Sequence, residues 1–239
     1  MPALPLIRQV VLLVPELQPA LAEFRKTFGF AEGIKSPGIT KWGFEHEVFT
    51  FGDSFLEICA PLKADSHPGR LMERRGAMGY MVVVQVDDLK KTVAKAAEAG
   101  IKPLFIEDLH GNAISQWHPK ALGTLVEFDQ VDPHDSWHYA PGVFERKCTD
   151  VALDVVGAVL AVADPEAMAS TWSNLLESPL INPTTLALRR TQLRFVPIAG
   201  ERSGLVEVEL APRNPSRVGE TIRLSGVDFS FISARGASK

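Results

Sequence analysis

The chain has 239 residues, of which 46% are hydrophobic and 23% are charged, and this is enough for one large or two small globular cores. Its formal net charge of −4 leaves no basic surface for nucleic acid and no polybasic segment for an anionic membrane, so neither partner is expected. The two cysteines, Cys59 and Cys148, have no metal-ligand spacing and are expected to be reduced thiols of a cytoplasmic protein.

The chain opens on MPALPLIRQVVLLVPEL, whose apolar run is short and is broken by Arg8, Gln9 and Pro15. The run has no basic leader and no small-residue cleavage site, and it is too short to span a membrane. We therefore expect it to form the first strand.

An internal repeat organises the rest of the sequence. Residues 7–30 read as an apolar strand, a turn, an amphipathic helix and a closing glycine, and residues 80–101 repeat that order. A weaker third copy covers 156–178. Apolar residues recur at helical spacing, which predicts one buried face per helix. These predicted stripes are Leu17, Leu21, Phe24 and Phe28; Leu89, Val93 and Ala97; and Met168, Trp172 and Leu175.

Strand-like segments follow the first two helices, and each copy ends on a strand with a central glutamate: Glu57 in FLEICAP and Glu127 in LVEFDQV. We interpret the two copies as βαβββ modules that pair edge to edge, which predicts an α+β fold with a curved eight-stranded sheet around a cavity. Glu57 and Glu127 would then be equivalent and would face this cavity. The alternative is that both glutamates lie in water, as most acidic residues in strands do.

Domain boundaries follow from the repeat and from the Pro-, His- and Asp-rich stretch VDPHDSWHYAPG at 131–142. We predict a complete domain over 1–130, a linker over 131–150 and an incomplete module over 151–239. In that last part GLVEVELA is expected to hold Glu207 and Glu209 in water. Its open sheet edge would need covering, so a homodimer is expected.

The duplicated βαβββ pattern with its two glutamates resembles the vicinal oxygen chelate superfamily of glyoxalases, epimerases and extradiol dioxygenases. The resemblance covers roughly residues 5–130. Within it, HGNAISQWHPKALGTLVEFDQ at 110–130 and ICAPL at 58–62 are most similar to methylmalonyl-CoA epimerases. No phosphate-binding glycine motif is present, so no nucleotide cofactor is expected.

The resemblance implies four side chains that converge on a divalent metal, at Gln9, Glu57, Met81 and Glu127. An amide or carboxylate oxygen suits a hard cation, whereas the thioether of Met81 is a soft, weak donor. Gln9, Glu57 and Glu127 are therefore the candidate ligands, with Gln9 and Met81 also expected to line the substrate site. A cavity without metal is the alternative.

The same resemblance places Trp117 and His118 at the substrate site, with His118 as a rim or structural residue. The epimerases carry a further catalytic acid on the strand that corresponds to KWGFEHEVFTF, where Glu45 and Glu47 are available here. By strand patterning we expect these two to be solvated and His46 to lie on the opposite face.

Two functions remain open at this stage. The first is an isomerase, epimerase or lyase in which Glu127, with Glu57, takes a proton beside a carbonyl or thioester group. The second is a metal-free protein that binds a small molecule without turning it over, as bleomycin-resistance proteins of this superfamily do.

Overall fold

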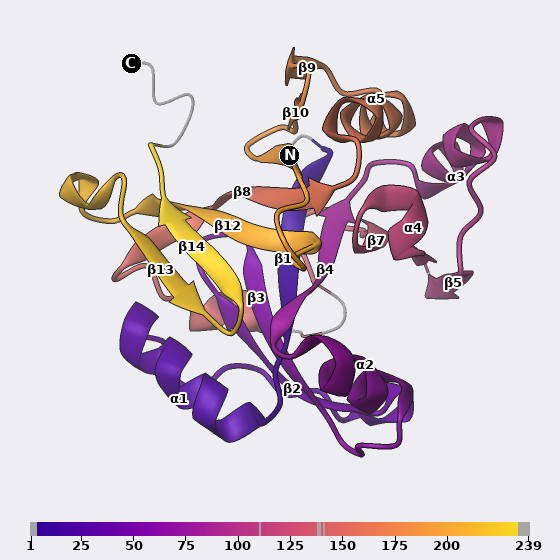
Figure 1. Ribbon diagram of the computed structural model, residues 1–239. Coiled ribbons are helices and arrows are strands. Elements are labelled where there is room, and N and C mark those ends of the chain that lie inside the picture. The colour runs from indigo at the N-terminus through magenta and orange to yellow at the C-terminus, as the bar shows by residue number, and fades with distance from the viewer. Residues whose placement is uncertain (1–3, 110, 138–139, 141, 234–239) are drawn as a thin grey trace. The chain divides into compact units, whose positions relative to one another are not determined.

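The computed structural model describes residues 4–109, 111–137, 140 and 142–233. These residues form two mixed sheets of seven strands each, with helices, so the predicted α+β class is confirmed (Figure 1). In the described part of the chain each sheet has seven strands rather than the eight expected for the first.

The first sheet holds β1 (Leu6–Leu13), β2 (Phe44–Thr50), β3 (Phe55–Pro61), β4 (Met78–Gln85), β5 (Phe105–Leu109), β6 (Asn112–Trp117) and β7 (Leu125–Gln130), in the order β2-β3-β1-β4-β7-β6-β5. The helical segments along it are α1 (Leu17–Phe28), η1 (Pro37–Trp42), α2 (His67–Arg75), α3 (Leu89–Glu98) and α4 (Pro119–Leu122). The expected strands at 7–14 and 80–86 thus belong to one sheet.

The second sheet holds β8 (Ala152–Val162), β9 (Leu180–Asn182), β10 (Thr185–Ala187), β11 (Gln192–Pro197), β12 (Gly204–Pro212), β13 (Thr221–Leu224) and β14 (Val227–Phe231), in the order β13-β14-β12-β8-β11-β10-β9. Its helical segments are α5 (Pro165–Leu176) and η3 (Pro215–Arg217), whereas η2 (Val143–Arg146) precedes β8 and packs against β2 of the first sheet.

One pairing rule recurs four times along the chain. The first strand of each module pairs in parallel with the last, as in β1 with β3, β4 with β7, β8 with β11 and β12 with β14. The last strand then pairs antiparallel with the strand before it. We expected one incomplete module after residue 150. The structure instead forms a βαβββ module there and, from β12 onward, three strands of a fourth.

The first module accounts for the missing eighth strand. Its expected extra strand is reduced to a single bridge, in which Ile34 and Val48 exchange two backbone hydrogen bonds of 2.9 Å. Next to this bridge the backbone at Gly33 packs closely against β2. A Cβ atom at this position would lie only 2.3 Å from the Val48 carbonyl oxygen. The residue-33 position therefore requires glycine.

By their internal contacts the residues divide into two compact units. Unit 1 comprises 1–8, 81–138 and 156–206, and unit 2 comprises 9–80, 139–155 and 207–239. Unit 1 packs Trp117, Phe128, Trp172 and Phe195 in its core, and unit 2 packs Phe24, Phe28 and Phe229. The sequence-based division at 130 and 150 stays a prediction.

The predicted helical stripes hold in part. All four stripe residues of α1 are buried, and Gly29 ends that helix in the left-handed conformation, at φ 80°. In α3 the buried face is Leu89, Thr92 and Ala96, one position away from the predicted stripe, and in α5 Ala169 replaces Met168 on it. Among the described residues, no helix has the length and apolar character needed to cross a bilayer.

Candidate functional site

Glu57, the expected carboxylate of the first module, lies in β3 and is only 5% exposed. Its strand is flanked by β1 and β2, which bring Gln9 and His46 to it. The Gln9 Nε2 amide donates to Glu57 Oε2 at 2.6 Å. The solvated alternative is therefore wrong for Glu57, because this carboxylate is buried and held by a hydrogen-bond donor.

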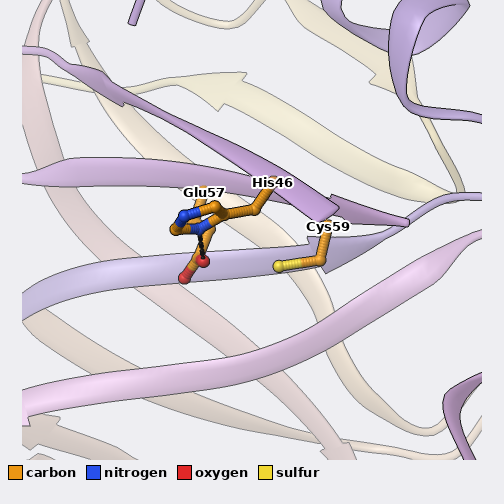
Figure 2. Close-up of side chains that lie close together, drawn as sticks. All are labelled: His46, Glu57 and Cys59. Atoms are coloured by element: carbon orange, nitrogen blue, oxygen red, sulfur yellow. Dashed lines mark hydrogen bonds and ion pairs between the residues drawn. The ribbon is translucent and has the colours of Figure 1, made fainter. Parts of the chain in front are cut away.

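His46 provides the second partner of this carboxylate. Its imidazole is 9% exposed, and Nδ1 makes a short hydrogen bond with Glu57 Oε1, as Figure 2 shows. The other ring nitrogen, Nε2, accepts a hydrogen bond of 3.0 Å from the backbone N–H of Ser36. Both nitrogens of His46 are thus engaged within unit 2.

The expectation of two solvated glutamates on β2 is wrong for one of them. Glu45 is exposed, but Glu47 is fully buried. It can be buried as a charged group because Arg25 pairs with it and the Gly33 backbone N–H donates to its Oε1 at 2.6 Å. Strand alternation predicted correctly that His46 faces away from Glu47, and from His46 onward both faces of β2 are buried.

Cys59 and Tyr80 extend the cluster around Glu57. Cys59 faces His46 across the β2–β3 pair, and its Sγ lies beside the Glu57 carboxylate in Figure 2. Burial, and then the negative charge of Glu57, raise the pKa of the Cys59 thiol well above its usual value. Burial, followed by Cys59 and Glu57, raises the pKa of Tyr80 to about 12. The sequence did not place either residue in the site, because Cys59 has no metal-ligand spacing and Tyr80 stands in no recognisable motif.

The second module places its carboxylate in a similar setting. Glu127 lies in β7, is 8% exposed, and accepts a hydrogen bond of 2.6 Å at Oε2 from Gln116 Nε2. Gln116 is its direct partner across the β6–β7 pair. Each of the first two modules therefore ends on a buried glutamate that is held by a glutamine of a neighbouring strand, and the solvated alternative is wrong for Glu127 as well.

Asp129 stands two residues from Glu127 on the same face of β7 and is fully buried. Burial, and then the neighbouring Glu127 carboxylate, raise its pKa well above the usual value of an aspartate. A proton on this carboxyl removes the repulsion between two buried charges. The sequence carries a signal for this pair, since two residues at spacing two, Glu127 and Asp129, share one face of a strand.

The other predicted residues lie as follows. Met81, in β4, is 9% exposed and pairs with Leu125 of β7. Trp117 is fully buried, donates its indole N–H to Ser115 Oγ at 2.8 Å and packs on Phe128, so it forms part of the core of unit 1. His118 is exposed and accepts at Nδ1 from the Lys120 N–H, which makes it the N-cap of α4.

The family resemblance implies a divalent metal. Two groups of side chains could supply its ligands, and both fit such an ion poorly. Of the predicted positions, Met81 offers a thioether, which does not suit a hard cation. Gln9 and Glu57 belong to unit 2 and Met81 and Glu127 to unit 1, so their convergence stays a prediction. Within the described residues, ligand atoms of His46, Glu57 and Cys59 lie within 4.8 Å of one another, but the Ser36 N–H faces His46 Nε2, the nitrogen that would have to carry the proton if Nδ1 bound a metal.

Comparison with known proteins defines the class. A family model described as a glyoxalase-like domain matches residues 10–176, which is well over half of the chain. The chain belongs to this glyoxalase-like domain family, within the vicinal oxygen chelate superfamily.

Among proteins of that superfamily the chain is similar to epimerases. It is 28% identical over 131 residues to an ethylmalonyl-CoA/methylmalonyl-CoA epimerase from Cereibacter sphaeroides, which covers 52% of this chain and 97% of that protein. A methylmalonyl-CoA epimerase structure from Mycobacterium tuberculosis matches at 20% identity and a TM-score of 0.47, over 56% of this chain and 94% of that one. A Streptomyces coelicolor methylmalonyl-CoA epimerase in complex with 2-nitronate-propionyl-CoA matches at 19% identity and a TM-score of 0.48. The match covers 56% of this chain and 100% of that one.

Proposed function

We propose that this protein is an isomerase or epimerase that acts on a carbonyl or thioester compound by proton abstraction. The observation that carries the proposal is the duplicated arrangement in which Glu57 and Glu127 are each buried and each held by a glutamine at 2.6 Å. Buried carboxylates with fixed partners are the groups that enzymes of this kind use as general bases.

In the proposed reaction Glu127 takes the proton from the carbon next to the carbonyl. The C–H bond breaks, its electron pair forms an enolate, and the proton resides on the carboxyl group. N–H donors stabilise the enolate oxygen. A second acid delivers a proton to the other face of the carbon, which inverts the centre, and Glu127 returns to its carboxylate form by losing its own proton to water. A lyase reaction would begin with the same abstraction and end with departure of a leaving group from the adjacent carbon.

A CoA thioester is the substrate class to test first, because the curated relative is named an ethylmalonyl-CoA/methylmalonyl-CoA epimerase. The protein is incubated in D2O with methylmalonyl-CoA or ethylmalonyl-CoA, and the signal of the α-proton is followed by NMR. We expect the signal to be lost as deuterium enters. Without exchange of either thioester, this substrate class is refuted.

Variants assign the roles. Glu127→Gln is expected to slow exchange by about 10²- to 10⁴-fold, the usual contribution of a general base. Glu57→Gln is expected to slow it as well. The matched control is Glu45→Gln, which removes an exposed carboxylate of the neighbouring strand and should leave exchange unchanged. Exchange that survives in Glu127→Gln would overturn its role as base.

A second candidate function is small-molecule binding without turnover. It is favoured by Met81, which places a weak donor where the resemblance implies a metal ligand. Calorimetry with the same thioesters separates the two functions. Binding without deuterium exchange in the wild type would favour this second function.

A further inference from the structure

The direction of one hydrogen bond determines where His46 carries its proton. The donor to Nε2 is the Ser36 backbone amide, which can only donate, so Nε2 must present its lone pair. A neutral imidazole then has its proton on Nδ1. Nδ1 faces Glu57 Oε1, and the short bond between them therefore runs from the histidine to the carboxylate.

The same geometry is unfavourable for a metal at Nδ1. A histidine that binds a metal through one nitrogen normally donates a proton from the other to an acceptor. Here the other nitrogen faces a donor. A metal on Nδ1 would need a proton on Nε2, and this would set two N–H groups against each other at 3.0 Å.

Glu47 fixes the loop that carries the Ser36 amide. Its buried carboxylate accepts from the Gly33 N–H at 2.6 Å and pairs with Arg25, while Lys35 lies 3.6 Å from its Oε2. The bridge between Ile34 and Val48 joins the same loop to β2. Glu47 and His46 are adjacent on one strand, so a single strand holds both the ring and the clamp on the loop that orients the ring.

We infer that Glu47 is the positioning residue of the site. By clamping residues 33–36 it presents the Ser36 N–H to His46, holds the imidazole with its proton on Nδ1 and makes His46 a hydrogen-bond donor to Glu57 rather than a metal ligand. Gln9 and His46 then give Glu57 two donors within one module, in the place where the family resemblance implies a cation. This assignment goes beyond the proposed reaction and does not depend on it.

The tautomer is measured directly by ¹⁵N NMR of the imidazole nitrogens, with the His46 signals assigned by their loss in His46→Gln. We expect the wild type to show a protonated Nδ1 and an unprotonated Nε2. A proton on Nε2 in the wild type, in either the neutral or the charged ring, would overturn the inference at once.

Variants test the clamp. Glu47→Gln is expected to populate the form with the proton on Nε2, because the loop loses its ionic anchor. Glu45→Gln removes an exposed carboxylate from the same strand and should leave the tautomer unchanged. Ser36→Ala keeps the backbone N–H and should also leave it unchanged. A tautomer that is the same in folded Glu47→Gln as in the wild type would refute the positioning role.

A second variant covers the case in which Glu47→Gln does not fold. Gly33→Ala keeps the residues of the ion pairs, Arg25 and Glu47, unchanged. It adds a Cβ atom that would meet the Val48 carbonyl oxygen, so the loop must shift. We expect the same change of tautomer. The metal readout is calorimetric titration with Zn²⁺: equal affinity in the wild type and in His46→Gln supports the inference, and tight binding that His46→Gln and Cys59→Ser both abolish contradicts it.

Discussion

At the scale of single residues, the neighbours of a buried carboxylate decide its state. Glu57 has two donors, Gln9 and His46, and so stays a hydrogen-bonded acceptor. For Asp129, by contrast, burial and then the neighbouring Glu127 carboxylate raise the pKa well above its usual value. The two residues have the same chemistry and similar burial, and they are predicted to behave differently.

Asp129 makes stability depend on pH. Its pKa is raised in the folded state, so above the ordinary aspartate pKa the unfolded chain releases a proton that the folded chain retains. Stability therefore falls as the pH rises from about 4, the unfolded pKa, toward the folded pKa. Asp129→Asn, which imitates the protonated acid, should stabilise the fold at neutral pH and have little effect at pH 3. Denaturant unfolding at several pH values tests this, and an Asp129→Asn variant less stable than wild type at neutral pH would contradict it.

The two cysteines should differ in reactivity. Cys59 is buried and its pKa is raised by burial and by Glu57, whereas Cys148 is partly exposed. Since the thiolate is the reactive form, we expect a disulfide reagent at pH 8 to modify Cys148 first and Cys59 only after unfolding. Thiol counting in Cys148→Ser isolates Cys59. Rapid labelling of that folded variant would contradict the assignment.

The strand face on which a side chain lies was predictable from sequence, but its contacts with distant parts of the chain were not. Strand alternation placed His46 and Glu47 on opposite faces, because the period of two is a local property. It did not show that Glu47 is buried, because this depends on Arg25 and Gly33, which reach it through tertiary structure. For the same reason the sequence pointed to Gln9, Glu57 and Glu127, but not to His46 and Gln116 as their hydrogen-bond partners.

At the scale of elements, the repeat was the most reliable prediction. Its strands and helices follow from hydrophobic periodicity, which any single copy displays. The strand counts were less predictable. The segment around Ile34 makes only one bridge, and the fourth module has the short turn η3 where the other three have a helix, so its sequence shows no helical stripe.

The turn between β2 and β3 depends on one half-buried carboxylate, that of Asp154. Asp154 accepts from the backbone N–H groups of Asp53, Ser54 and Val155 at 3.0–3.1 Å. Asp154→Ala would leave these donors without their acceptor, which we expect to cost about 1–3 kcal/mol of stability, the usual penalty for an unsatisfied buried group. Chemical denaturation measures the loss. Asp154→Asn retains one acceptor and should lose less, and an Asp154→Ala variant as stable as wild type would show that the turn does not need this carboxylate.

At the scale of the whole molecule, one sheet edge is apolar and open to solvent. Strand β9 ends the second sheet, and its Leu180 and Ile181 are 40% and 41% exposed. Natural proteins cover such edges, and we predict that this protein forms a homodimer. Light scattering gives the mass. Leu180→Lys together with Ile181→Lys should yield monomers, while a wild type that stays monomeric at high concentration would refute the prediction.

The assignment of the last module to unit 2 has a consequence for biosynthesis. The ring of Phe229 packs against Phe24 and Phe28 at 5.6 Å, although about two hundred residues separate them along the chain. Because the ribosome synthesises the chain from its N-terminus, α1 emerges long before β12–β14. Residues 9–80 must therefore remain with one apolar face uncovered until β12–β14 have been synthesised. A nascent chain stalled at residue 203 should engage chaperones through this face, and one that carries the final strands should not.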